Sequence, residues 1–304
     1  MRRFLSWLTS SQLSQGTPNT TSLALPLPPA VKLQSGSLTI AVILHVYYLE
    51  LATEIAEYLS NIRCPFDLYI STDTPEKQAA LRQHFLSDMV QKIDIRVVPN
   101  RGRDIAPKLV TFADIYVKYD VALFIHTKRS AHQSYLAGWR KFILSQLIGT
   151  EVIVENILGL FSTFPDLGII APKHFEPIFS DIRWGMNWEG AKQLADRLDI
   201  MVQERVPIDF PSGSMFWVRP AALLPLVRLN LSFEDFEPEL GQKDGTLAHQ
   251  LERFFLFACE KAGYRWLKVA RPEFFKDRSM IVHALHREDC ERILCSGLLR
   301  SHAG

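Results

Sequence analysis

The chain has 304 residues, of which 47% are hydrophobic and 22% are charged, which is ordinary for one large globular domain or two modest ones. Its 34 Lys and Arg residues nearly balance its 33 Asp and Glu residues, so the net charge of +1 gives no reason to expect nucleic acid as a partner. The four cysteines form no CxxC pair and no metal-binding pattern, which fits a reducing compartment such as the cytoplasm.

The N-terminal region is poor in folding signals. Residues 9–29 are rich in Ser, Thr, Pro and Gln, and we expect residues 1–36 to be a disordered tail. No apolar run reaches the roughly 18 residues that a membrane-spanning helix needs. A second interpretation is that basic and apolar side chains at the start of the tail contact the inner membrane, namely Arg2, Arg3, Phe4, Trp7 and Leu8.

Apolar runs and helical periodicity alternate along the domain that we expect over residues 37–274. In its first half, strands are predicted at 38–44, 66–71, 93–98 and 121–125, separated by helices at 51–62, 76–86 and 109–119. In its second half, strands are predicted at 167–171, 214–218 and 265–270, and helices at 136–147, 151–164, 189–198, 220–227 and 246–262. This order predicts an α/β fold with a mainly parallel, Rossmann-like sheet flanked by helices. Residues 275–304 are expected to be an extension that is partly helical or disordered.

Ligands of such sheets bind beyond the carboxyl ends of the strands. Segment 100–107 (NRGRDIAP) follows the third predicted strand and suits an anion. Gly102 permits a tight turn, Arg101 and Arg103 carry positive charge, and the next helix would offer free N–H groups. Asn100 and Asp104 complete the segment. The alternative is a surface turn in which Asp104 merely caps the helix.

Three other strand ends carry candidate ligands. Segment 126–130 (HTKRS) supplies His126 and Lys128 for a diphosphate. The alternative is that polar residues are simply expected where a buried strand reaches the surface. Asp73 could accept a hydrogen bond from a base or ribose, or simply form a turn. His45 and Tyr47 follow the first strand, where a histidine is often structural and a tyrosine ring could stack on a base.

Asp244 precedes the long helix predicted at 246–262 and is a candidate general base. Glu239, just upstream, is its leading rival. The alternatives are that Asp244 is a helix cap and that the helix residues after it, His249 included, form a solvated face. The sequence contains no HExxH, GxGxxG, P-loop or GxSxG motif, so the corresponding metalloprotease, dinucleotide, ATPase and hydrolase functions are disfavoured.

Seven segments together resemble the rhamnan synthesis F family of bacterial polysaccharide proteins. They are IAVILHVYY (40–48), FDLYIST (66–72), NRGRDIAP (100–107), FIHTKRS (124–130), WGMN (184–187), SGSMFWVRP (212–220) and DGTLAHQLER (244–253). The resemblance implies a glycosyltransferase, inverting in mechanism, that adds L-rhamnose from dTDP-L-rhamnose to a growing lipid-linked cell-surface glycan at the cytoplasmic side of the membrane. The rival hypothesis is a non-catalytic glycan-binding or assembly protein on the same scaffold.

The layout is also similar to that of GT-A glycosyltransferases, which implies roles for individual residues. Asp73 and residues 100–104 fall where that fold holds the nucleotide, and Asp244 falls where it carries the base. His126, Thr127 and Lys128 stand where a metal-binding Asp-x-Asp is usual. We therefore expect no metal site and no essential Mg²⁺ or Mn²⁺, with basic residues neutralising the diphosphate instead. Sugar rings are expected against an inner surface formed by Trp184, Asn187, Met215, Trp217 and His249.

Overall fold

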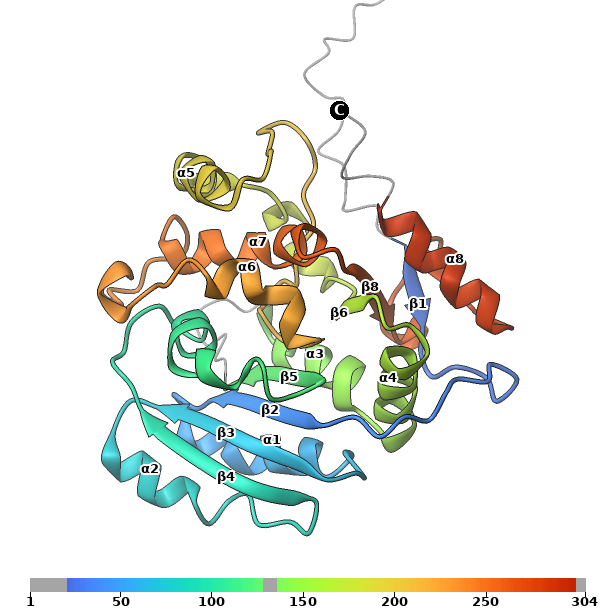
Figure 1. The fold of residues 1–304 in the computed structure, drawn as a ribbon, viewed down its shortest axis with the longest axis horizontal. Coiled ribbons are helices and arrows are strands. Elements are labelled where there is room, and N and C mark those ends of the chain that lie inside the picture. The colour runs from blue at the N-terminus through green and yellow to red at the C-terminus, as the bar shows by residue number, and fades with distance from the viewer. Residues whose placement is uncertain (1–20, 128–135, 299–304) are drawn as a thin grey trace, which may run out of the picture.

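The computed structural model describes residues 21–127 and 136–298, which form one α/β domain around a single nine-stranded sheet. The strand order is β4-β3-β2-β5-β7-β6-β8-β1-β9 (Figure 1). The strands are β1 Ser22–Ala24, β2 Ile40–His45, β3 Phe66–Thr72, β4 Val90–Val97, β5 Val121–His126, β6 Leu167–Pro172, β7 Phe216–Val218, β8 Arg265–Ala270 and β9 Ile281–Val282. Among these, β7 alone runs antiparallel to its neighbours, so the predicted mainly parallel sheet is confirmed.

The central strands are buried on both faces, as their continuous apolar sequences predict. All six residues of β5 (VALFIH) and of β6 (LGIIAP) are buried, and β2 is buried as far as Leu44. Such strands need a layer of helices on each side. The seven strands predicted between residues 38 and 270 all form, with ends shifted by a few residues.

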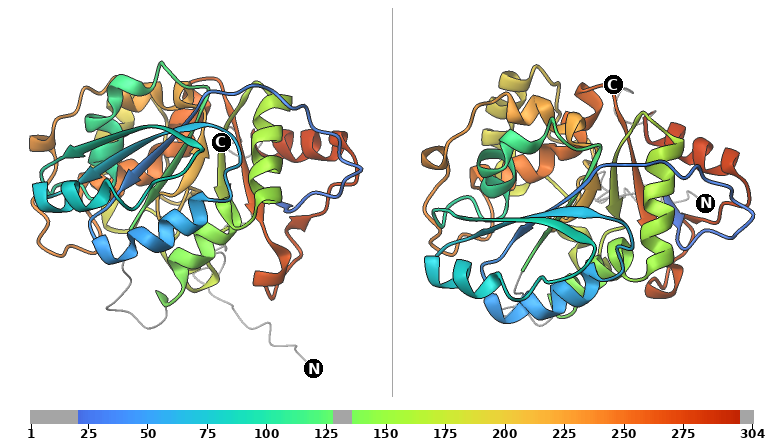
Figure 2. Two further views of the ribbon diagram at one scale, coloured as in Figure 1. Left: turned by 90° about the horizontal axis from the view of Figure 1, so that it is seen from below. Right: turned by 60° about the horizontal axis from the view of Figure 1, so that its bottom comes forward.

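Helices supply those two layers. They are α1 Ala52–Leu59, α2 Pro75–Leu81, α3 Trp139–Ile148, α4 Glu151–Thr163, α5 Trp188–Leu198, α6 Leu224–Val227, α7 Leu247–Lys261 and α8 Arg287–Leu298. Figure 2 shows α1 and α2 on one side of strands β2–β4, with α6 and α7 on the other. Local capping fixes several starts: the Thr74 hydroxyl accepts from Lys77 N, and the Thr150 hydroxyl from Ile153 N, each at 3.3 Å.

The prediction of one α-helix at 109–119 is wrong. The chain instead forms a π turn at Pro107–Thr111 and a 3₁₀ turn at Ala113–Ile115. This wider turn carries Lys108 into the interior, where its amine reaches Asp104 and Ser214. A π turn at such a place is typical of a functional site.

The predicted tail of 36 residues is wrong in its second part, because residues 22–24 form strand β1. This strand pairs in parallel with β8 and with β9, and Leu23 has no exposed surface. Figure 1 shows it in blue beside β8, with the C-terminal helix α8 against it. The first 20 residues, and with them the basic and aromatic side chains near the start, lie outside the described residues. The C-terminal extension likewise belongs to the domain, through β9 and α8.

Among the described residues, no single helix is long and apolar enough to cross a membrane. Helices α3 and α4 together reach the necessary length and composition, but they meet at a bend of 63°. Most of their apolar side chains are buried against the rest of the domain.

Candidate functional site

The site lies at the carboxyl ends of β3, β2 and β5, where three polar residues stand side by side. His45 pairs in register with Ser71 on one side and with His126 on the other. His45 Nδ1 lies 2.9 Å from Ser71 Oγ. One residue further along, the Thr127 hydroxyl accepts from the backbone N–H groups of Tyr47 and Tyr48, each at 3.0 Å. Thr127 thus fixes the turn of the chain after β2.

A buried polar network adjoins this row. Lys108, with 1% of its surface exposed, donates to Asp104 Oδ2 and to the Ser214 carbonyl, the latter at 2.7 Å. The Ser214 hydroxyl donates to the same carboxylate oxygen. His126 Nε2 donates to the Gly213 carbonyl at 2.8 Å and lies 3.8 Å from Asp104 Oδ2. Asp104 is therefore the centre of an ion-pair network, which is a different role from that of a helix cap.

The charges in this network follow from its burial. Burial by itself raises the pKa of Asp104, but His126, Lys108 and the hydrogen bonds from Lys108 and Ser214 outweigh it and hold the pKa well below its usual range. Burial lowers the pKa of Lys108, partly offset by Asp104. Burial also lowers the pKa of His45 to about 4. Above pH 5 the site therefore presents an ionised carboxylate beside a neutral imidazole.

The arginine loop, residues 100–104, is folded against a segment from far along the chain, residues 236–242. Arg101 forms a β-bridge with Pro238, and its Nη1 donates to the Phe236 carbonyl at 3.3 Å. Arg103 donates to the Gln242 carbonyl, and its Nε lies 3.5 Å from Glu239 Oε2. The two arginines are thus partly engaged by segment 236–242, while Asn100 is exposed beside them.

Backbone conformation makes this contact possible. Gly102 has φ +67°, and a Cβ there would lie 2.5 Å from the Phe236 ring. Arg103 also has a positive φ, of 55°, which is unusual for a residue with a side chain. Strained residues of this kind persist only where their surroundings fix them, and they concentrate at functional sites.

Asp244 is held by the WGMN segment and by Arg253 of helix α7. Asn187 Nδ2 donates to its Oδ1 at 2.5 Å, and the Met186 N–H donates to its Oδ2 at 3.3 Å. Arg253 Nη2 is 3.3 Å from the same Oδ1. The helix is capped by Thr246, together with His249 Nδ1 at 2.7 Å, so the alternative that Asp244 is only a cap is wrong. The Asp244 side chain keeps 26% of its surface exposed.

The predicted sugar-binding surface is wrong. Trp217 and Met215 have no exposed surface, and Trp217 Nε1 donates to the Leu147 carbonyl in the core. Trp184 is buried and stacks on Phe257. Asn187 is buried and serves to hold Asp244, and buried His249 belongs to the start of α7. These side chains support the site from within and cannot touch a sugar ring. Met186, from the same segment, is 78% exposed beside Asp244 instead.

Asp73 and Tyr47 are joined by a lysine that the sequence did not single out. Lys77 Nζ is 2.6 Å from Asp73 Oδ1, donates to the Tyr47 carbonyl at 2.7 Å and lies 4.5 Å from the centre of the Tyr47 ring. The pair is partly exposed, at 16% for Asp73 and 25% for Lys77. Lys128, the remaining predicted ligand, lies outside the described residues.

A second buried network, also missed from the sequence, lies beyond β6 and β8. His174 Nδ1 is 2.8 Å from Ser212 Oγ, and its Nε2 is 2.9 Å from Asp209 Oδ1. Lys268 Nζ is 2.8 Å from the same Asp209 oxygen. The signal in the sequence was a lysine inside an otherwise apolar strand (RWLKVA), since a buried lysine needs a buried partner.

The two networks meet in segment 211–214, which leads into β7. Ser212 contacts the second network, while Gly213 and Ser214 contact the first. The Gly213 N–H also donates to Glu252 of α7 at 2.8 Å. The segment is thus fixed from three sides at the carboxyl edge of the sheet.

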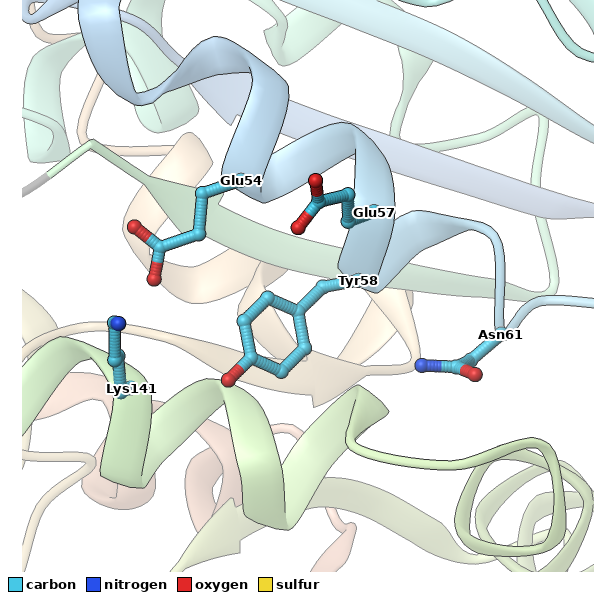
Figure 3. Close-up of a pocket in the computed structure, with 5 residues that line it drawn as sticks. All are labelled: Glu54, Glu57, Tyr58, Asn61 and Lys141. Atoms are coloured by element: carbon cyan, nitrogen blue, oxygen red, sulfur yellow. The ribbon is translucent and has the colours of Figure 1, made fainter.

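A surface depression of about 290 Å³ lies elsewhere, between α1 and α3 (Figure 3). It is lined by Glu54, Glu57, Tyr58, Asn61 and Lys141. Two of these are already engaged: Glu54 with Arg140 at 2.6 Å, and Asn61 with the Ile148 carbonyl at 2.8 Å. None of the predicted ligands lines this depression, so it is separate from the site described above.

We also searched the described residues for groups of side chains that could bind a metal ion. In the parts of the chain that the structure describes, no three His, Cys, Asp or Glu side chains are grouped so that they could hold a metal ion. At the position of an Asp-x-Asp motif, His126 Nε2 is bound to a carbonyl and the Thr127 hydroxyl to two backbone N–H groups. His126 Nε2 and the Thr127 hydroxyl are thus already engaged by the protein itself.

Comparison with known proteins tests the family resemblance that the seven motifs suggest. The family model described as Rhamnan synthesis protein F matches residues 17–264. Two relatives, both called "Uncharacterized protein WxcX" and both from strains of Xanthomonas campestris pv. campestris, are 34% identical to this chain over 250 residues. The alignment covers 81% of this chain and 35% of each relative, so the chain spans about a third of their length. The match confirms the resemblance carried by the motifs: the chain belongs to the rhamnan synthesis protein F family.

Proposed function

We propose that this protein is an inverting glycosyltransferase of the GT-A type. In this proposal it transfers L-rhamnose from dTDP-L-rhamnose to a growing, lipid-linked bacterial polysaccharide at the cytoplasmic face of the inner membrane. The family, which is named for rhamnan synthesis, supports the substrate class. The acceptor is glycan, and nucleic acid is not a partner.

One observation carries the proposal. The arginine loop at the carboxyl end of β4 lies directly against segment 236–242, which leads to Asp244. Positive charge for a departing diphosphate and carboxylates for an acceptor hydroxyl are thus brought together from positions more than 130 residues apart in sequence. Preorganised charge of this kind stabilises a leaving group without reorganisation.

Asp244 is the proposed general base. Its Oδ1 is fixed by Asn187 and Arg253, while Oδ2 has one backbone donor and the side chain remains partly exposed. A carboxylate held in this way can take a proton from an acceptor hydroxyl in a fixed direction. Glu239 contacts Arg103 and is the second candidate for this role.

The test is release of dTDP from dTDP-L-rhamnose in the presence of a rhamnan acceptor. Asp244→Asn should bind the donor as the wild type does but transfer sugar about 10²–10⁴-fold more slowly, because positioned bases contribute that much. Glu239→Gln is the matched control and should lose much less. Transfer by Asp244→Asn at the wild-type rate would reject Asp244 as the base.

The same assay distinguishes the proposal from its alternatives. A glycan-binding or assembly protein would retain the rhamnan and release no dTDP. Excess EDTA should leave most of the activity, because we propose that a divalent cation is not essential. Complete loss that Mg²⁺ or Mn²⁺ restores would reject that part.

A further inference from the structure

Asp104 uses only half of its carboxylate in the buried network. Lys108 and the Ser214 hydroxyl both bind Oδ2, and His126 approaches the same oxygen. Among the described residues, Oδ1 has no hydrogen-bond partner, and 12% of the side chain is still exposed. Oδ1 is thus the accessible oxygen of an otherwise buried carboxylate, and it can accept a hydrogen bond from a ligand or from water.

The surroundings of that oxygen suit a hydroxyl group. The negative charge of Asp104 adjoins neutral His45, whose Nδ1 is bound to Ser71. An ionised carboxylate repels a phosphate but is a strong acceptor for an O–H donor. The phosphates of a nucleotide sugar would therefore lie towards the arginines, and a hydroxyl of the same ligand would lie over Asp104.

We propose that Asp104 is a specificity-determining residue, whose Oδ1 accepts a hydrogen bond from a hydroxyl group of the bound nucleotide sugar. Lys108 and Ser214 are positioning residues that fix the carboxylate plane from behind. The inference rests on the proposed function, because it takes the ligand to be a nucleotide sugar. The hydroxyl belongs either to the transferred sugar or to the nucleoside, and both sources share this chemistry.

The Asp104→Asn variant tests whether Oδ1 of Asp104 acts as a hydrogen-bond acceptor for the ligand. The Lys108 amine and the Ser214 hydroxyl are both donors, so the amide should turn its oxygen towards them. Its NH₂ group then takes the place of Oδ1, and an acceptor becomes a donor with almost no change in shape. A charge-assisted hydrogen bond lost in this way weakens binding about ten- to a hundredfold.

Calorimetric titration with dTDP-L-rhamnose and, separately, with dTDP identifies the hydroxyl. If it belongs to the sugar, Asp104→Asn weakens binding of dTDP-L-rhamnose about ten- to a hundredfold and leaves dTDP unchanged. If it belongs to the nucleoside, both ligands weaken equally. Wild-type affinity of the variant for both ligands would overturn the inference.

Asp209→Asn is the matched control, because Asp209 is also paired with a buried lysine and also adjoins segment 211–214. It should leave both affinities within about twofold, since Asp209 belongs to the second network. If Asp104→Asn does not fold, the neutral pair Asp104→Asn with Lys108→Gln replaces it, and the same titrations decide. If the wild-type protein binds neither ligand, the proposed function itself is rejected. This outcome differs from the one that would overturn the role of Asp104 alone.

Discussion

At the scale of single residues, Gly102 is the position where the arginine loop depends most on the absence of a side chain. Its Cβ would meet Phe236 at 2.5 Å and Ala106 at 2.6 Å, in a backbone conformation with φ +67° that other residues avoid. The contact with Phe236 comes from segment 236–242, and the contact with Ala106 comes from the turn that follows the loop. The sequence predicted a tight turn here but could not show which distant segment fills the space.

We expect Gly102→Ala to lower the free energy of unfolding by about 2–4 kcal/mol, from backbone strain and overpacking together. Gly241→Ala is the control, because Gly241 has φ +81° but nothing within 4 Å of the added Cβ. That variant should lose only about 1 kcal/mol. Urea denaturation of both variants measures the difference, and equal losses would show that the contact with Phe236 contributes nothing.

Residue type alone misled the prediction of the sugar-binding surface. Aromatic and apolar residues near strand ends can face a ligand or the core, and the sequence contains no signal that separates the two. Trp184 and Trp217 proved to be core residues, whereas Met186, whose backbone N–H donates to Asp244, is exposed. The charged candidates Asp73, Asp104 and Asp244 each lie beside a basic side chain, because charged side chains rarely enter a core without a partner.

At the scale of elements, the strands with long apolar sequences could be predicted, and the shortest strands could not. The central strands have continuous apolar sequences, which favour burial in a parallel sheet. Strand β1 has three residues between proline-rich segments, and β9 has two, so neither carries a periodic signal. Strand β1 forms along the edge that β8 offers, and β9 forms along the edge of β1, so both depend on tertiary contacts.

Leu23 tests whether β1 is an integral strand. It has no exposed surface and lies opposite Val269 of β8. Leu23→Ala should lower the free energy of unfolding by about 2–5 kcal/mol, as for other buried leucines. Lys32→Ala, at an exposed position on the same N-terminal segment, should change it by less than about 0.5 kcal/mol.

The comparison is made by chemical denaturation of the two variants beside the wild type. A disordered segment would respond equally weakly to both substitutions. Equal, small effects would therefore restore the disordered tail that the sequence suggested.

At the scale of the whole molecule, two buried networks tie the halves of the sheet together. Asp104 and Lys108 come from the first half of the chain, Asp209 and Lys268 from the second, and segment 211–214 contacts both. Each network also contains or adjoins a histidine with a lowered pKa. Such long-range pairings are invisible in a single sequence, because no local pattern marks the partner of a buried charge.

This arrangement gives the stability of the domain a predictable pH dependence. Burial lowers the pKa of His174 to about 4, with Lys268 and Lys173 lowering it and Asp209 opposing them. The unfolded chain takes up a proton on this histidine below about pH 6.5, whereas the folded protein does so only near pH 4. The unfolded state therefore binds more protons, and stability falls as the pH drops through this window.

A histidine shifted in this way removes about 2–3 kcal/mol of stability between pH 7 and pH 4.5. Asp104 and Asp209 contribute little there, because their lowered pKa values keep both ionised in the folded protein and an unfolded aspartate, with a pKa of about 3.9, is also largely ionised over that range. In His174→Gln the titrating group is gone, so the loss over the same interval should be smaller by about that amount. Urea denaturation at several pH values measures both curves. Parallel curves for the variant and the wild type would mean that His174 takes up its proton equally well in the folded and unfolded chains, which its burial between Lys268 and Lys173 argues against.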